Sequence, residues 1–121
     1  MRAIEHWEKA ARLEASRTKG LDERDDYELI IWSCIQGGGQ LANVILHNRG
    51  ITGENQDQIH SDIPELKQEL PHDITEFLAA LKSIESLGPR FVRGNEPIRR
   101  EVVKSCLDAY AKVKASAKKS L

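Results

Sequence analysis

The feature that most constrains this chain is a run of three glycines inside an apolar stripe with helical spacing. Residues 36–49 read Gln-Gly-Gly-Gly-Gln-Leu-Ala-Asn-Val-Ile-Leu-His-Asn-Arg, and the stripe keeps its period through the glycines. Three glycines in a helix interior cost roughly 2–3 kcal/mol relative to three alanines. A helix that retains them indicates that another backbone or a ligand comes close at this point.

Four segments have the periodicity of amphipathic helices, and no repeat or linker separates them. The first is expected to place Ile4, Trp7, Ala10 and Ala11 on one apolar face. Gly88-Pro89 is a strong stop signal for the third, and a proline suits the first turn of the fourth. The four helices are expected at about 2–18, 23–48, 73–87 and from Pro97 to about 117.

The segment 50–72 interrupts the helical pattern with glycine and prolines, and Thr52 and Asp62 are each placed to cap a short helical turn, the second over about 62–70. A loop this long in a compact domain often has a role beyond connection. The chain, 1–121, is therefore predicted to be one domain: an all-α, up-and-down four-helix bundle with a long, partly helical crossover between the second and third helices.

The second predicted helix is apolar over more of its circumference than one neighbour requires. It is therefore either central in the bundle or shared with a partner chain. We expect a homodimer in which the glycine-bearing face of this helix meets a second copy. The residues assigned to that interface are Gly37, Gly38, Leu41 and Ile45.

Composition limits where the protein acts. Charges interrupt the N-terminal residues where a signal peptide would be apolar, and no apolar run reaches membrane-spanning length. A cytoplasmic protein without membrane association is expected. Cys34 and Cys106 fall on apolar helix faces and are expected to be free, buried thiols.

The net charge of −1 conceals a strong asymmetry along the chain. Residues 20–87 carry 13 acids and 4 bases, whereas residues 88–121 carry 9 bases and 3 acids. Blocks of opposite charge either attract each other or mark a surface for RNA or another polyanion. The basic candidates gather at the entrance to the fourth helix and are Arg90, Arg93, Arg99 and Arg100.

Three histidines lie at or beyond the end of the second helix, and in principle they can converge on a metal ion. Their separations of 13 and 12 residues fix no geometry, so local hydrogen bonding is the alternative interpretation. No metal or other cofactor is expected. A metal-dependent enzyme that uses His47, His60 and His72 is the competing hypothesis.

The chain resembles the HEPN superfamily of small helical bundles over about residues 20–117. The resemblance rests on the long second helix with small residues, the stretch His-Ser-Asp-Ile-Pro-Glu-Leu at 60–66 and the loop Gly-Pro-Arg-Phe-Val-Arg-Gly at 88–94. Many members dimerise, and active members are RNases with an Arg and a following His near the start of the last helix. No histidine follows His72 here, so the resemblance implies binding rather than RNA cleavage.

The sequence therefore predicts a non-catalytic binding or interaction protein with an arginine-rich edge for a polyanion or an acidic partner. The resemblance implies a nucleotidyltransferase or toxin-type protein as that partner. A divergent RNase is the enzymatic alternative.

Overall fold

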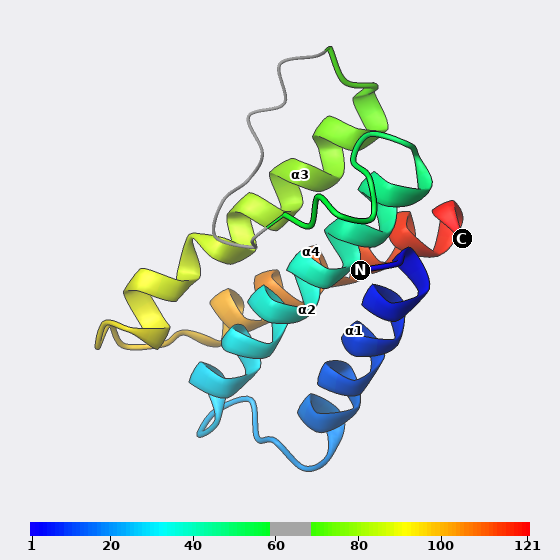
Figure 1. Ribbon diagram of the computed structural model, residues 1–121. Helices are drawn as coiled ribbons and strands as arrows, with labels where there is room; N and C mark the ends of the chain where they lie inside the picture. The colour runs from blue at the N-terminus through cyan, green and yellow to red at the C-terminus, as the bar shows by residue number, and fades with distance from the viewer. Residues whose placement is uncertain (59–68) are drawn as a thin grey trace.

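The computed structural model describes residues 1–58 and 69–121, and helices dominate these residues, with no strand among them. The helices run alternately up and down the molecule (Figure 1), which confirms the predicted all-α four-helix bundle. A short π-helical turn, η1, lies between the last two helices. The elements are α1 (Ala3–Thr18), α2 (Tyr27–Asn48), α3 (His72–Glu85), η1 (Gly88–Val92) and α4 (Arg100–Ser120).

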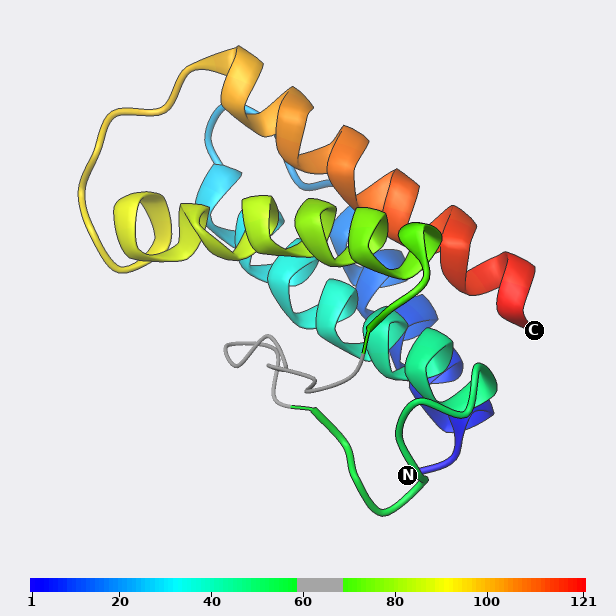
Figure 2. The same ribbon diagram turned by 90° about the horizontal axis from the view of Figure 1, so that it is seen from above.

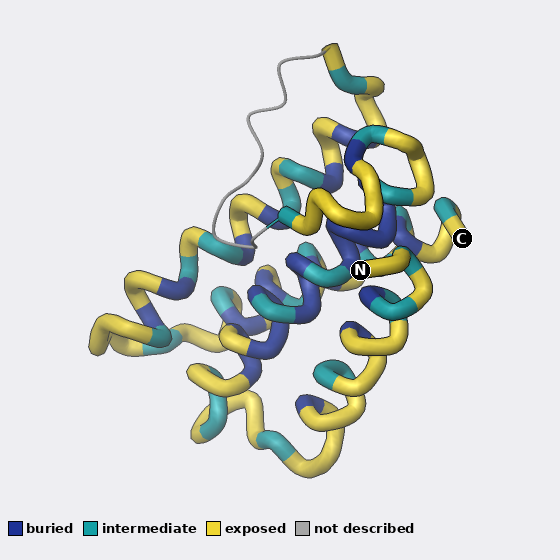
Figure 3. The backbone as a smooth tube through the Cα atoms, in the orientation of Figure 1, coloured by how far each residue is buried: buried dark blue, intermediate teal, exposed yellow. Residues whose placement is uncertain are grey.

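Helix α2 is the centre of the bundle. It contacts α1, α3, η1 and α4. Figure 1 shows it between α1 and α3, and Figure 2 shows α3 and α4 along one side of it. Its second half is buried almost continuously (Figure 3). The broad apolar surface of this helix is thus explained by its central place in the bundle.

The three glycines lie inside α2 without interrupting it. A Cβ atom added at Gly37 would lie 3.0 Å from Cε2 of Tyr110 on α4, and one at Gly38 would lie 2.9 Å from Cδ1 of Leu81 on α3. Real Cβ atoms are almost never that close to such neighbours. The missing side chains therefore let α3 and α4 pack closely against α2.

The buried face of α1 differs from the predicted one. Its buried residues are His6, Ala10 and Arg17, whereas Ile4 is 46% exposed. Arg17 fits in the core because its guanidinium carbon lies 4.4 Å from the centroid of the Tyr110 ring and its Nη1 donates to Ser33 Oγ at 3.3 Å. Two polar residues, His6 and Arg17, thus occupy buried positions on α1, and the spacing of apolar residues alone does not predict this.

Helix boundaries follow local hydrogen bonds. Helix α2 begins four residues later than predicted, because the Asp22 carboxylate accepts the backbone N–H groups of Arg24 and Asp25 and forms a turn there. The chain does not leave helical geometry at Gly88-Pro89, because η1 continues it to Val92. Helix α4 begins at Arg100 rather than Pro97.

The described parts of the crossover, residues 49–58 and 69–71, form turns, bends and irregular chain rather than helix. The helical turn predicted at 62–70 falls largely outside the described residues. Both cysteines are free and buried, as predicted.

Helix α2 is long and apolar enough to cross a membrane by length and composition alone. However, 78% of its most apolar window is buried inside the bundle. That burial is typical of the core helix of a soluble protein.

Candidate metal centre

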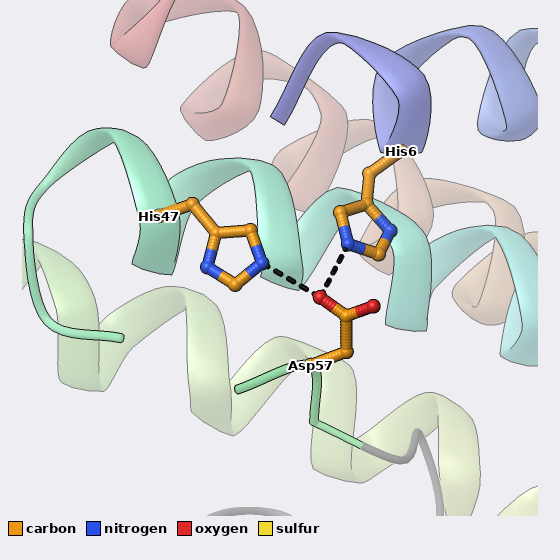
Figure 4. A group of neighbouring side chains, drawn as sticks. All are labelled: His6, His47 and Asp57. Carbon is orange, nitrogen blue, oxygen red and sulfur yellow. Dashed lines mark hydrogen bonds and ion pairs between the residues drawn. The ribbon is translucent and has the colours of Figure 1, made fainter. Parts of the chain in front are cut away.

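Three side chains from distant parts of the chain converge at one end of the bundle (Figure 4). Nε2 of His6, on α1, and Nε2 of His47, on α2, each lie 2.9 Å from the same carboxylate oxygen, Oδ1 of Asp57. The centroids of the two imidazole rings are 5.3 Å apart. The two imidazoles and the carboxylate therefore form a single polar cluster.

His6 is held from its other ring nitrogen. Its Nδ1 lies 2.6 Å from Oε1 of Gln40 on α2, and the His6 side chain is only 3% exposed. Because α1 packs antiparallel to α2, a residue near the start of α1 lies beside the last turns of α2. This contact fixes the ring so that Nε2 points toward Asp57.

His47 is held in the same way by the turn that follows α2. Its Nδ1 lies 2.9 Å from Oγ1 and 3.3 Å from the carbonyl oxygen of Thr52. Thr52 is folded back over the helix end, since its backbone N–H donates to Leu46. The His47 side chain is 3% exposed, so it also has a fixed orientation.

Asp57 is positioned by the residue that follows it. Asn43, on α2, accepts the backbone N–H of Gln58 at 2.8 Å and donates to its carbonyl oxygen at 3.1 Å. Asn43 is 2% exposed, so this pair of bonds anchors the loop to the core. The Asp57 side chain itself is 41% exposed, which leaves one side of the cluster open to solvent.

The Asp57 carboxylate is stabilised as an anion. Burial raises its pKa, but hydrogen bonds with His47, His6 and the amino group of Met1 together outweigh burial and hold the pKa well below its usual range. The Met1 amino group lies 3.1 Å from Oδ2 and 3.2 Å from Oδ1. The cluster therefore presents an ionised carboxylate.

The hydrogen-bond pattern of His6 suits a metal ligand. Both of its ring nitrogens face an oxygen, since Nδ1 lies beside Gln40 and Nε2 beside Asp57. With a metal on Nε2, the neutral ring needs only one hydrogen, on Nδ1, directed to Gln40. Metal-bound histidines almost always donate their second N–H to such an acceptor.

The spacing of the donor atoms also suits a metal ion. In a tetrahedral site, bonds of about 2.0–2.2 Å place adjacent ligand atoms roughly 3.3–3.6 Å apart, whereas the two observed nitrogen–oxygen distances are 2.9 Å. The three candidate ligand atoms all lie within 4.8 Å of one another. The cluster fits a divalent ion with small adjustments of the rings.

Of the three histidines in the metal hypothesis based on sequence, the described structure places only His47 in this cluster. His47 belongs to the cluster, but its partners are His6 and Asp57, which that hypothesis did not include. His72 is exposed at the first residue of α3 and is not a member. His60 lies outside the described residues.

A sequence signal for this centre does exist. Gln40, Asn43 and His47 form a polar row at helical spacing in the otherwise apolar second half of α2. Such a row inside a buried helix needs polar partners, because buried polar groups are nearly always hydrogen-bonded. The row indicates where partners must lie, although not which residues provide them.

The predicted arginine edge does not gather around one cavity. Arg90 donates to Glu96 and lies over the Phe91 ring, with its guanidinium carbon 4.8 Å from the centroid. Arg93 lines a groove beside α2, while Arg100 lines a separate cavity beside the turn after α1. Arg99 is exposed and directly precedes α4. The alternative interpretation was that the basic residues pair with acidic residues of the same chain, and this is observed for Arg90.

The residues assigned to a dimer interface, Gly37, Gly38, Leu41 and Ile45, are buried within the single chain. Leu41 and Ile45 are 1% and 2% exposed. A second copy would have to displace α3 or α4 to reach the glycines. The assignment of these four residues to a dimer interface is therefore wrong. Homodimerisation through another surface stays a prediction.

No family model, curated protein or solved structure matches this chain. The resemblance to the HEPN superfamily therefore rests on its sequence features alone. Any functional assignment has to come from the chemistry of the described residues.

Proposed function

We propose that this protein binds one divalent transition-metal ion through Nε2 of His6, Nε2 of His47 and the carboxylate of Asp57. One observation carries the proposal: two buried imidazoles direct Nε2 at one carboxylate oxygen, 2.9 Å away, while Gln40 and Thr52 hold both Nδ1 atoms. This arrangement provides preformed ligands together with the outer hydrogen bonds that orient them.

The donor set selects the class of metal. Imidazole nitrogen suits zinc, iron, copper and nickel, whereas magnesium and calcium prefer a shell of oxygens. Two imidazoles and one carboxylate therefore favour a first-row transition ion. The exposed side of Asp57 leaves further coordination positions to water or an external ligand.

The bound ion would connect three segments that are distant in the sequence: α1, the end of α2 and the loop at residues 51–58. This supports a binding protein in which the metal fastens the loop to the bundle. The amino group of Met1, which pairs with Asp57, would give way to the ion.

The test is metal binding by the whole protein after treatment with a chelator. Co²⁺ serves as the spectroscopic probe and Zn²⁺ as the competitor, with the bound metal counted by elemental analysis. We expect one ion per chain and a Co²⁺ spectrum characteristic of mixed nitrogen and oxygen ligands. His6→Gln, His47→Gln and Asp57→Asn are each expected to weaken binding by more than about tenfold.

His72→Gln is the matched control, since His72 is exposed and outside the cluster. It is expected to bind the ion like the wild type. Circular dichroism of each variant checks that the helices are retained. A wild-type protein that keeps no ion, or a folded His6→Gln variant that binds as tightly as the wild type, would refute the proposal.

A further inference from the structure

The two cysteines of the chain meet in the core, where α2 packs against α4. Both helices run in the same direction (Figure 1), so their residues advance together. Gly37 on α2 lies against Tyr110 on α4, and Cys34 and Cys106 lie one turn earlier on the two helices. The two thiols are joined by a hydrogen bond, and the two residues are 0% and 1% exposed.

The helix packing at this point suits a covalent bond between the thiols. Gly37 has no side chain to hold α4 away from α2. Axes of packed helices lie about 8–10 Å apart and each Cα lies about 2.3 Å from its axis, so residues that face each other have Cα atoms roughly 3.5–5.5 Å apart. A disulfide bond needs about 4.4–6.8 Å. Cys34 and Cys106 can therefore be joined with little movement of either backbone.

A buried cation lies beside the two thiols. Arg17 on α1 is 9% exposed, and its Nη1 donates to Ser33, the neighbour of Cys34 in the sequence. Within residues 1–58 and 69–121, Arg17 forms no ion pair with a carboxylate. A buried charge is costly without an opposite charge beside it. A thiolate at the cysteine pair would provide that charge.

The contact makes the two thiols unequal. The hydrogen bond from Cys106 and the positive charge of Arg17 lower the pKa of Cys34, and together they outweigh the opposing effect of burial. The carboxylate of Glu14 also opposes them, but it is paired with Lys114. The same hydrogen bond, together with burial, raises the pKa of Cys106. Cys34 is therefore the thiol that ionises first, while Cys106 keeps its proton.

A cavity gives small molecules access to this pair. It measures about 370 Å³, lies between the end of α3, η1 and the first turns of α4, and has Cys106 in its wall. Arg90 and Glu101 give the wall charges of both signs, and Ser83 and Ser105 contribute hydroxyl groups. Such a wall suits a small, uncharged, polar molecule that can form hydrogen bonds. Hydrogen peroxide has these properties.

We propose that Cys34 and Cys106 form a redox-active pair, which a small hydroperoxide such as hydrogen peroxide oxidises to a reversible disulfide bond. The Cys106 sulfur attacks one peroxide oxygen, the O–O bond breaks, and the Cys106 proton passes to the Cys34 sulfur. The other oxygen leaves as hydroxide and takes up the proton that Cys34 released to solvent, which gives one water. Cys106 is then a sulfenic acid.

The second step forms the bond between the helices. The Cys34 sulfur attacks the Cys106 sulfur, the S–S bond forms, and the S–O bond breaks. The departing oxygen takes the Cys34 proton and leaves as a second water. The two sulfurs lose two electrons in all, and the peroxide gains them. A dithiol reductant returns the pair to its reduced form by thiol–disulfide exchange.

The experiment follows disulfide formation in the full chain after addition of a stoichiometric amount of hydrogen peroxide at neutral pH. A chelator is present throughout, and the proposed metal centre is distant, since His47 lies 13 residues, or about 20 Å of helix, beyond Cys34. Alkylation and mass spectrometry count the remaining thiols. Because the chain has only two cysteines, an intramolecular disulfide must join Cys34 to Cys106.

The same reaction in urea, where the chain is unfolded, is the reference. Thiols that are merely buried oxidise more slowly in the folded protein, whereas a prepared pair oxidises faster. We expect disulfide formation to be at least about tenfold faster in the folded protein than in urea. Dithiothreitol is expected to restore both thiols.

Substitutions of Arg17 test the part played by its charge. Arg17→Gln removes the charge and is expected to slow disulfide formation by at least about tenfold, while Arg17→Lys keeps the charge and should retain most of the rate. Arg12→Gln, an exposed position on the same helix, is the matched control and should react like the wild type. Circular dichroism checks that each variant is folded.

Three results would overturn the proposal. The first is a folded wild type that forms the disulfide more slowly than the unfolded chain. The second is a product other than the intramolecular disulfide, such as a sulfinic acid or a disulfide between two chains. The third is a folded Arg17→Gln variant that reacts at the wild-type rate.

Discussion

Asn43 connects the core of the protein to the loop that carries Asp57. Replacing Asn43 with Ala leaves the backbone N–H and carbonyl of Gln58 without their partners. We expect a loss of about 1–3 kcal/mol in unfolding free energy, together with weaker metal binding because Asp57 is no longer held in place. Denaturant unfolding and Co²⁺ titration measure the two effects.

Asn55→Ala is the control for this substitution, since Asn55 is an exposed residue of the same loop. It is expected to change neither quantity appreciably. If Asn43→Ala left both stability and metal affinity at wild-type values, the anchoring role of Asn43 would be wrong.

Tyr110 supplies a pH-dependent contribution to stability. Burial raises its pKa to about 12 from a usual value of about 10, despite the nearby Arg17 guanidinium. The folded state holds the phenol proton more tightly than the unfolded state, so this contribution is complete below about pH 10. It is lost as the pH rises toward 12, and its size is at most about 2–3 kcal/mol.

The Tyr110→Phe variant isolates that effect. The Tyr110 hydroxyl has no hydrogen-bond partner among the described residues, so near neutral pH the variant is expected to be about as stable as the wild type. Between pH 10 and 12 it should lose less stability than the wild type. Equal losses in the two proteins, measured by urea unfolding at each pH, would contradict this account.

At the scale of whole elements, the glycines of α2 make unequal contributions. At Gly37, an added methyl group meets the rigid Tyr110 ring at 3.0 Å, whereas at Gly38 it meets only the terminal methyl of Leu81 at 2.9 Å, which can rotate away. Alanine also gains about 1 kcal/mol of helix propensity. Gly38→Ala is therefore expected to be nearly neutral, and Gly37→Ala to destabilise by about 1–3 kcal/mol.

Thermal unfolding of the two variants decides between this packing account and helix propensity alone. Propensity alone predicts that both substitutions stabilise the protein equally. A Gly37→Ala variant at least as stable as Gly38→Ala would show that Tyr110 does not limit the space at Gly37.

The helices were predictable because apolar side chains recur with helical spacing in all four. The face of α1 was not predictable in the same way. His6 and Arg17 occupy buried positions because Gln40, Asp57, Ser33 and Tyr110 provide partners for them, and those partners come from other elements. A pattern of apolar residues within one helix contains no information about such pairs.

The candidate metal centre was predictable only in part for the same physical reason. His47 stood out because of its place at the end of the second helix, but its partners depend on how the chain packs. His6 reaches it through the antiparallel packing of α1 on α2, and Asp57 through a loop fixed by Asn43. No fixed spacing along the sequence encodes either contact.

For the molecule as a whole, a metal ion held by three segments must stabilise the folded state, because the ligands are together only when the chain is folded. With the free ion at 100 times its dissociation constant, the gain in unfolding free energy is expected to be about 2.7 kcal/mol. Asp57→Asn should abolish most of this gain, while His72→Gln should retain it. Unfolding in the presence of Zn²⁺ or of a chelator measures the difference.

The central claim is that His6, His47 and Asp57 bind one metal ion. Its most direct test is anomalous diffraction from crystals of the protein grown with Zn²⁺, measured on both sides of the zinc absorption edge. The account predicts one strong anomalous peak about 2.0–2.2 Å from Nε2 of His6, Nε2 of His47 and a carboxylate oxygen of Asp57. The absence of a peak at this cluster would contradict the claim, whether or not zinc is bound elsewhere in the crystal.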